Sequence, residues 1–492
     1  MAKNWDSTSR RNFIKTSLGG IAALTIIPST VMSGFGHNAP SDRLNIGAIG
    51  VGGVGYQNLL NLENENIVAL CDVDTDYAQK SYRRWNRAAT YSDFRQMLEK
   101  EKSLDAVIIA TPDHTHAIAA ISAMQLQKHV FVQSPASHSV FAMQRMIETA
   151  STYDIVSQVG NRAASGDESR DIAEIIWSGE IGEIKEIHAW TSEPLWQQGL
   201  QYPADDMWVP KNLNWDLFLG PTSFIPYHKK YTPFGWRAFW EFGNGALGIK
   251  GPSVLEPVFR ALKLSAPIQV QASSSNLNME GVPKSQKIAF DFARRNNLPK
   301  LAMPELRLHW YDGGLMPATH ETLPDDVLEE YKNGGLFIIG KYATLVCGEG
   351  GYNYKIFRNG LQQNVEVEPS VHRVPGGKDG HESDWVRACK EPAQNRLEAS
   401  ASFEGQGALT ETILVGAMAV KLQSLHRKLE WDSAQMRFVN INDSETFSVQ
   451  TKRGFYLQNN VAKIREDYKE YNANRFIAET VRPLSRSGWM QI

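Results

Sequence analysis

The sequence predicts an α/β unit with a doubly wound parallel sheet, followed by an α+β unit with an open, mostly antiparallel sheet. From 43 to about 160, strand-length apolar segments alternate with helical segments, as a parallel sheet with helical crossovers requires. After 165 the strands alternate apolar and polar residues, which is typical of an antiparallel sheet with one open face. The 492 residues exceed what one hydrophobic core usually spans, so the length also indicates two domains.

The individual elements follow from these patterns. In the first unit, strands are expected at 43–50, 66–73, 105–112, 128–133 and 156–160, and helices at 77–89, 92–101, 116–127 and 139–153. The second unit opens with a helix, a glycine-rich turn and an alternating strand within 167–194. Further strands are expected at 268–276, 287–293, 306–312, 335–347 and 354–360, and an amphipathic helix at 408–425.

A glycine-rich turn follows the first strand, with the spacing Gly50-x-Gly52-x-x-Gly55 and with Gly53 and Val54 between the last two glycines. Glycines at this spacing permit a tight turn, a close approach of backbone N–H groups to a pyrophosphate, and close packing of helix on strand. The turn therefore predicts a dinucleotide site in a Rossmann unit.

The carboxylate of Asp72 ends the next strand, about 20 residues after the glycines, where it can accept a hydrogen bond from a ribose 2′-hydroxyl. An acid at this place favours NAD over NADP, because it repels a 2′-phosphate. Arg83 and Arg84 keep NADP as the alternative.

The N-terminus is expected to be a targeting signal. Residues 9–15, SRRNFIK, resemble a twin-arginine export signal, and the apolar segment at 18–27 is shorter than a membrane span. The expected division is a signal and linker at 1–40, a nucleotide-binding domain at 41–165, an α+β substrate and oligomerisation domain at 166–440, and an extension at 441–492. The mature protein is then periplasmic, without a membrane span.

Composition excludes some partners. A formal net charge of −3 offers no electrostatic footprint for nucleic acid or an anionic membrane. Cys71, Cys347 and Cys389 are few and widely spaced, so neither a disulfide nor a metal site is predicted, and Cys71 is expected in the core. Tryptophans cluster at 190–240, where they either stack on sugar rings or pack an aromatic core.

Several motifs in order resemble the Gfo/Idh/MocA oxidoreductases, in particular an exported, sugar-active branch. The motifs are GVGGVG, ATPDHTHA (110–117), VFVQSPAS (130–137), QVGNRAASG (158–166), GEIGEIKEIHAW, NWDLFLGP, YTPFGWRAFWEFGNGALG, HWYDGGLMP, HESDWVRACK (381–390) and the terminal SGW. The resemblance implies contact of the cofactor's nicotinamide half with residues of three of these motifs: Thr111, Pro112, His114, His116, Ser134, Pro135 and Asn161.

The chain departs from this family at three positions. Typical members read Glu-Lys-Pro where this chain has Gln133-Ser134-Pro135, and Gly-Asp-x-Gly-x-His where it has 248–253, GIKGPS. Ser134, Ile249 and Ser253 therefore stand in the places of the family's lysine, aspartate and histidine. Oxidation of an alcohol requires a base near the hydroxyl, and these side chains do not supply one unaided.

Two hypotheses follow from these departures. In the first, Lys250 is the catalytic base, with a pKa lowered by a cationic nicotinamide. Lys250 lies just before a helix that is expected to start at Pro252. In the second, the protein is redox-silent and binds a sugar or a partner subunit, such as an active paralogue. Other proton carriers considered are His309, His320 and His381, and Trp236 and Arg237 are expected to bind substrate together with His381.

The expected function is that of an exported NAD-dependent oxidoreductase that transfers a hydride at a ring carbon of a carbohydrate or glycoside. A redox-neutral, NAD-dependent glycosidase is the enzymatic alternative. The family resemblance also implies a homo-oligomer.

Overall fold

The computed structural model describes residues 42–492 except 206, 276, 299–300 and 460. The predicted export signal lies outside the described residues. Leu44–Ile492 form one compact unit. Within the described part of the chain, no helix combines the length and apolarity needed to cross a bilayer.

The first sheet is parallel throughout and has the order β3-β2-β1-β4-β5-β6, which confirms the doubly wound fold. Its strands are β1 (Asn45–Ile49), β2 (Asn66–Cys71), β3 (Ala89–Tyr91), β4 (Ala106–Ile109), β5 (His129–Gln133) and β6 (Ser157–Gly160). The strand order reverses between β1 and β4. A ligand crevice is therefore expected at the carboxyl ends of these two strands.

Helices connect these strands as expected, with one difference. They are α2 (Gly53–Asn61), α3 (Gln79–Arg84), α4 (Phe94–Lys100), α5 (Asp113–Gln125) and α6 (Val140–Thr152). The helix expected over 77–89 is reduced to α3. The carboxylate of Asp74 accepts hydrogen bonds from the backbone N–H groups of Asp76 and Tyr77, and this turn delays the start of the helix.

The second sheet is mixed and mostly antiparallel, as predicted, with the order β16-β15-β14-β13-β7-β12-β9-β8-β17-β18. One pair, β7 with β12, is parallel. The strands are β7 (Ile184–Thr191), β8 (Gln269–Ser274), β9 (Gln286–Phe292), β12 (Leu306–Tyr311), β13 (Gly334–Gly340), β14 (Thr344–Gly348), β15 (Lys355–Arg358), β16 (Leu361–Gln363), β17 (Leu429–Asp432) and β18 (Arg437–Phe438).

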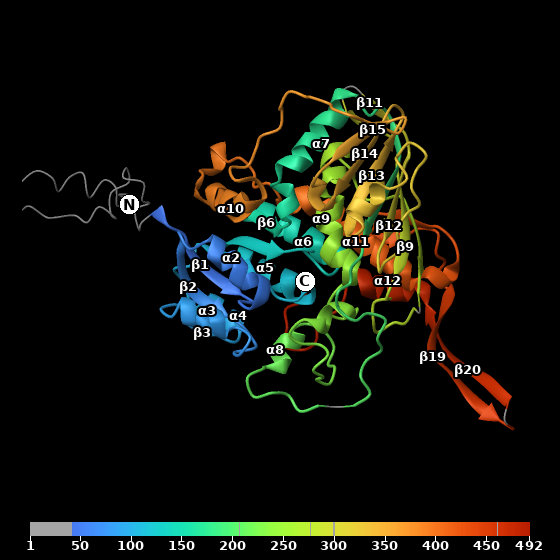
Figure 1. Ribbon diagram of the computed structural model, residues 1–492. Helices are drawn as coiled ribbons and strands as arrows, with labels where there is room; N and C mark the ends of the chain where they lie inside the picture. Colours follow the sequence, from blue (N-terminus) through green and yellow to red (C-terminus); the bar gives the residue numbers. More distant parts are fainter. Residues whose placement is uncertain (1–41, 206, 276, 299–300, 460) are drawn as a thin grey trace, which may run out of the picture. The chain divides into compact units, whose positions relative to one another are not determined.

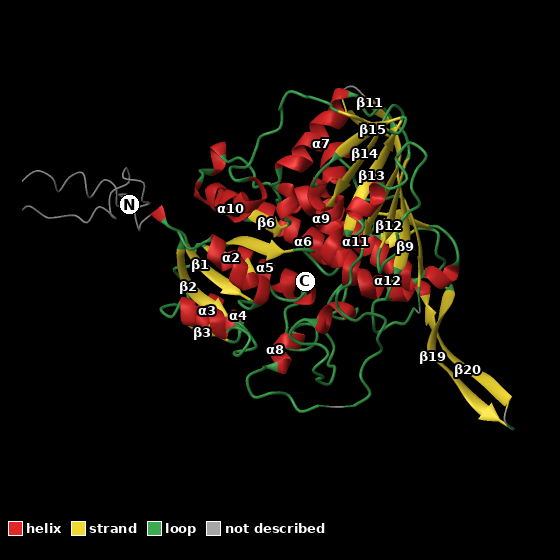
Figure 2. Ribbon diagram, in the orientation of Figure 1, coloured by secondary structure: helices red, strands yellow, loops and turns green. Residues whose placement is uncertain are grey.

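Helices cover one face of this sheet (Figure 2). They are α7 (Asp167–Ser178), α9 (Gly245–Leu262) and α11 (Phe403–Lys421), whose apolar side chains share one core with the inward residues of the strands. Gly416 of α11 allows close packing, because a Cβ there would lie 2.7 Å from the ring of Phe290 on β9. The largest buried contact of the second domain is therefore between three helices and one sheet face.

The remaining elements surround these two layers. They are α8 (Trp215–Leu219), α10 (His381–Lys390), α12 (Ala473–Val481) and two small hairpins, β10 (Arg295–Leu298) with β11 (Leu301–Met303) and β19 (Thr446–Gln458) with β20 (Val461–Asn472). The β19–β20 hairpin extends beyond the body of this unit in Figure 1. Sequence patterns did not indicate this hairpin.

Three further boundaries differ from expectation. The strand expected at 335–347 is a hairpin of β13 and β14, because the chain reverses at 340–343. Helix α11 begins earlier than 408, because the Ser402 hydroxyl caps it by accepting from the N–H of Gly405. Helix α9 begins at Gly245 and contains Pro252, where the sequence suggested that it began.

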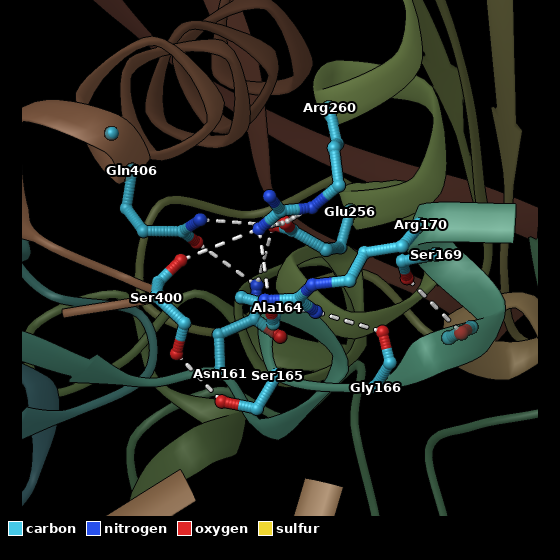
Figure 3. A network of polar contacts seen from close by, with 12 residues as sticks. Asn161, Ala164, Ser165, Gly166, Ser169, Arg170, Glu256, Arg260, Ser400 and Gln406 are labelled. Carbon is cyan, nitrogen blue, oxygen red and sulfur yellow. Dashed lines mark hydrogen bonds and ion pairs between the residues drawn. The ribbon is translucent and has the colours of Figure 1, made fainter. Parts of the chain in front are cut away.

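A buried polar network joins the two domains (Figure 3). Glu256 of α9 is 2% exposed. Its Oε2 accepts from Asn161 Nδ2 at 3.1 Å and Gln406 Nε2 at 2.9 Å, and its Oε1 accepts from Arg260 Nη2 at 2.8 Å. Arg260 also donates to the Ala164 carbonyl at 3.1 Å. One carboxylate therefore connects the end of β6, helix α9 and helix α11.

Replacement Glu256→Ala is expected to lower the free energy of unfolding by about 3 kcal/mol, because it leaves buried donors without their acceptor. Urea or thermal unfolding measures this effect. A matched control is Glu99→Ala at an exposed position of α4, expected to change stability by at most about 0.5 kcal/mol. Equal stabilities of the two variants would contradict the role given to the network.

Candidate functional site

The glycine turn between β1 and α2 has the close backbone contacts that its spacing predicts. Gly50 has a φ of +78°, and a Cβ there would lie 2.7 Å from the Ala110 carbonyl oxygen at the end of β4. A Cβ at Gly55 would lie 1.9 Å from the carbonyl oxygen of Gly50. A side chain at either glycine would therefore push the turn out of shape. Because neither residue has a side chain, the turn keeps this shape at the N-terminus of α2, and a helix N-terminus offers unpaired N–H donors to an anion.

Asp72 lies beside this turn and is buried. Its Oδ2 accepts from the backbone N–H of Val51 at 2.9 Å and of Gly52 at 3.2 Å, and its Oδ1 accepts from the N–H of Asp74 at 3.0 Å. Burial raises its pKa to about 6, against the lowering effect of these N–H groups. A carboxylate has about four acceptor positions, so Asp72 can still accept from a ribose hydroxyl.

A cleft runs along the carboxyl ends of β1 and β4 and is closed from the other side by the second domain. We call it the cofactor cleft. Of the residues expected to bind cofactor or substrate, those that line it are Gly50, Gly52, Gly53, Val54, Asp72, Thr111, Pro112, His116, Ser134, Trp236 and Arg237. The structure therefore brings most of the expected site together in one place.

Aromatic and cationic side chains of the second domain form the opposite wall of the cleft. Trp236 is buried, and the Arg237 guanidinium lies over its ring at 4.2 Å and over Phe234 at the same distance. Arg237 donates to the Phe234 carbonyl at 3.1 Å. These contacts hold the Arg237 side chain in place where it lines the cleft.

Asp113 is a buried carboxyl in the cleft that sequence reasoning did not single out. It begins α5, it is 1% exposed, and its Oδ2 has no hydrogen-bond partner among the described residues. Burial raises its pKa to about 7, although the charge of Arg237 and the side chain of Asn244 lower it. The sequence signal that could have pointed to Asp113 is its position directly after Thr111-Pro112. The sequence alone does not show that an acid at the end of a strand is buried.

Tyr77 and Trp489 also line the cleft without having been assigned there. The Tyr77 ring covers the glycine turn, where a Cβ on Gly52 would lie 2.1 Å from it. Trp489 packs against Phe94 of α4 at 6.1 Å, and Arg95 lies over its indole at 4.3 Å. Close by in the sequence, Arg486 binds Asp216 of α8. The segment around 486–489 thus connects the two walls of the cleft.

A second cavity, of about 750 Å³, adjoins the cofactor cleft at Ser134, which lines both. We call it the polar chamber, after the polar side chains in its wall: Ser134, Asn161, Arg162, Glu168, Ser253, Glu330, Asn333, Glu349, Tyr352, Asn353 and Lys378. Its volume lies within the range of small-molecule pockets. Its wall is rich in amide, carboxylate and cationic groups.

Lys250 does not line the cleft or the chamber. Its ammonium donates to Glu349 Oε2 at 2.9 Å, and the Ser253 hydroxyl donates to Glu349 Oε1 at 2.5 Å. Glu349 belongs to a short 3-10 turn (Glu349–Gly351) after β14. The sequence signal for this acid is the Gly348-Glu349-Gly350-Gly351 turn directly after a buried strand.

Besides Lys250 and His381, four residues expected at the site lie outside the cleft. Gly55 lies beneath the glycine turn. The carbonyl oxygen of Pro135 lies 2.9 Å from His116 Nδ1. Asn161 belongs to the Glu256 network and also lines the polar chamber. His114 is buried between the Phe218 and Phe242 carbonyls, and burial lowers its pKa to about 4. These contacts give His114 a structural role behind the wall of the cleft.

His381 is the clearest correction. It is fully buried, with Nδ1 2.7 Å from the Ser165 hydroxyl and Nε2 2.9 Å from the Val159 carbonyl. Its ring packs edge-on against Phe131 of β5. Both ring nitrogens are occupied and the side chain is closed to solvent, so the expected contact of His381 with substrate is wrong.

Among the described residues, Glu186, His188 and His309 are close enough together to hold a metal ion. Their contacts instead form a hydrogen-bond network, with Glu186 Oε1 3.1 Å from His188 Nε2 and 3.3 Å from His309 Nε2. The two imidazoles stack at 4.8 Å and 22°, and both Nε2 atoms face the same carboxylate oxygen. That the protein lacks a metal stays a prediction.

Comparison with known proteins agrees with this architecture. One family model, described as the oxidoreductase family with an NAD-binding Rossmann fold, matches residues 44–161. A second, described as the C-terminal alpha/beta domain of the oxidoreductase family, matches residues 183–298. The chain belongs to the Gfo/Idh/MocA family of oxidoreductases.

Two relatives illustrate the range of this family. A myo-inositol 2-dehydrogenase of Thermotoga maritima is 25% identical over 154 residues, which are 31% of this chain and 46% of the relative. A glycosyl hydrolase family 109 protein of Solibacter usitatus is 32% identical over 162 residues, which are 30% of this chain and 37% of the relative. The chain thus spans less than half the length of these curated relatives.

A solved structure shows the same fold. The WlbA dehydrogenase from Bordetella pertussis, in complex with NADH and UDP-GlcNAcA, superposes with a TM-score of 0.55 over 79% of this chain and 99% of that chain. The two sequences are 13% identical, so this likeness concerns the fold.

The residues of the cleft fit NAD, the cofactor of this Rossmann family. Side chains at Gly50 and Gly55 would fill the turn that a pyrophosphate must approach, and both are absent. Asp72 offers acceptors at the ribose position.

Asp113 predicts a pH-dependent stability. Between about pH 4 and 7 the unfolded chain has lost the Asp113 proton and the folded protein keeps it, because its folded pKa is about 7. This contribution to stability therefore falls as the pH rises through that window, by at most about 4 kcal/mol. Replacement Asp113→Asn removes it, so the melting temperature of the variant relative to wild type is expected to be higher at pH 8 than at pH 5. A difference that stays constant with pH would contradict this assignment.

Proposed function

We propose that this protein is an exported NAD-dependent oxidoreductase that oxidises a hydroxyl group of a carbohydrate or glycoside. The observation that carries the proposal is the junction at Ser134, where a cleft suited to NAD opens into the polar chamber. Carbohydrates present many hydroxyls, and amide, carboxylate and cationic side chains of the chamber can bind them. Tyr352, largely exposed in the chamber wall, offers an aromatic face for a sugar ring.

The roles of the cleft residues follow from their positions. The turn at 50–55 would hold the pyrophosphate, Asp72 the adenosine ribose, and Thr111, Pro112, Ser134 and Trp236 would enclose the nicotinamide half. NAD+ supplies the hydride acceptor when bound. Arg237, held over Trp236, would orient a polar group at the inner end of the cleft.

The glycosidase alternative rests on one comparison, the similarity to glycosyl hydrolase family 109 proteins. It uses the same cleft and chamber, and it differs in giving no net change in the cofactor. Product analysis separates the two: a ketosugar with accumulated NADH supports oxidation, and a released aglycone without NADH supports hydrolysis.

Export and self-association are further proposals. The arginine pair at residues 10–11 supports export of the folded, cofactor-loaded protein through the twin-arginine route. Periplasmic fractionation of cells that express wild type or a variant with both arginines replaced by lysine tests export. Light scattering of the purified protein tests whether it is a homo-oligomer.

The purified protein is expected to contain NAD(H), which mass spectrometry of the denatured sample detects. Incubation with myo-inositol, D-glucose or methyl β-D-glucoside is expected to raise the absorbance near 340 nm. Replacement Gly55→Ala should abolish cofactor retention, because its Cβ would meet the Gly50 carbonyl oxygen. A folded wild-type protein that neither retains nor binds NAD(H) would refute the proposed function. Retained NAD without reduction by any sugar would favour the redox-silent alternative.

A further inference from the structure

The polar chamber contains three acidic side chains, and they differ in what they touch. Glu330 is bound to Lys355 and to the Asn353 amide, away from α9. Glu168 lies on α7. Glu349 is bound to Ser253 of α9, one helical turn beyond Ile249, which lines the cofactor cleft. Among these acids, Glu349 is therefore the one attached to the helix that separates chamber from cleft.

The position of Glu349 depends on close packing behind it. Gly350 and Gly351 follow with φ values of +68° and +88°. A Cβ on Gly350 would lie 3.2 Å from that of Ala163, and one on Gly351 would lie 3.0 Å from Ile172 of α7. The backbone of this turn is therefore pressed against the helical layer, which leaves the Glu349 side chain to point toward α9.

Two donors from α9 fix the Glu349 carboxylate. Lys250 Nζ donates to Oε2 at 2.9 Å, and Ser253 Oγ donates to Oε1 at 2.5 Å. The side chain nevertheless stays 40% exposed and lines the chamber. A carboxylate that is held on one side and open on the other has the geometry of a general base.

We propose that Glu349 is the catalytic base of this protein, that Ser253 connects it to the substrate hydroxyl, and that Lys250 is a positioning residue. The inference rests on the proposed function. In the step, the substrate O–H proton passes to the Glu349 carboxylate, directly or through the Ser253 hydroxyl, and C=O forms as the hydride leaves for NAD+. The products are a ketone, NADH and protonated Glu349, so charge and electrons balance.

Two other candidates for the base fit the geometry less well. Lys250 is engaged with Glu349 and does not line the chamber. Asp113 lies in the cleft rather than in the chamber, and its free oxygen Oδ2 has almost no exposed surface. Their variants therefore discriminate between the three assignments.

The experiment compares Glu349→Gln, Ser253→Ala, Lys250→Met and Asp113→Asn with wild type in the full-length protein. Glu180→Gln is the matched control, because Glu180 forms an exposed ion pair with Arg358 and lines neither the cleft nor the chamber. With the sugar that wild type oxidises fastest, Glu349→Gln is expected to slow single-turnover NADH formation at least about 100-fold, with NAD content unchanged. The control is expected to stay within twofold.

The positioning role has its own signature. Lys250→Met is expected to keep measurable activity and to lower kcat more than it changes KM, because the Glu349 carboxylate loses one of the two donors that hold it. Lys250→Arg, which keeps a donor at this place, is expected to restore most of the rate. Ser253→Ala is expected to lower the rate about tenfold. Chemical rescue of a Glu349→Gly variant by formate, which does not rescue Asp113→Asn, would further support a carboxylate base at 349.

A second readout does not depend on turnover. The negative charge of Glu349 near the cleft is expected to favour cationic NAD+ over NADH. Glu349→Gln should therefore raise the ratio of the dissociation constant of NAD+ to that of NADH about two- to fivefold. If wild type binds NAD and no sugar reduces it, the proposed function fails, and this ratio still tests the charge of Glu349 near the cofactor. An unchanged ratio, or full activity of Glu349→Gln with loss in Asp113→Asn or Lys250→Met, would overturn the assignment of Glu349.

Discussion

The position of helix α9 is the constraint on which the site depends. Its N-terminal half carries Ile249 to the cofactor cleft and Ser253 to the polar chamber, so any shift of the helix alters both. The buried carboxylate of Glu256, which follows Ser253 on the same helix, fixes the helix to the end of β6 and to α11. Because buried carboxylates are stable only with a full set of donors, this network tolerates one arrangement of the three elements.

Local patterns predicted the nucleotide-binding half well. The glycine spacing, the apolar strands and Asp72 lie within a short stretch of sequence, and each has a steric or electrostatic reason that does not depend on distant residues. The second sheet was predicted only from the alternation of apolar and polar residues along its strands. The hairpin at β13–β14 was missed because its turn at 340–343 interrupts an otherwise continuous apolar pattern.

The chemistry was harder to predict because it depends on contacts between distant segments. Glu349 reaches Ser253 across 96 positions of sequence, and the pKa of Asp113 depends in part on Arg237 and Asn244 of the other domain. For two residues, the position within a motif led to an expectation that differs from the structure. His381 begins a helix whose first residue is packed beneath β5, and Lys250 was placed before a helix that in fact starts at Gly245.

Trp489 gives the cofactor cleft an order of assembly. Every other residue that lines the cleft precedes it in the chain, so on the ribosome the cleft is completed by the segment that emerges after all the rest. The indole packs on α4 and its neighbour Arg486 on α8, so the contacts that join the two walls here come from the last part of the cleft to be synthesised. A chain that stops before Arg486 would lack these contacts, and its cleft would have one wall contact fewer to enclose a cofactor.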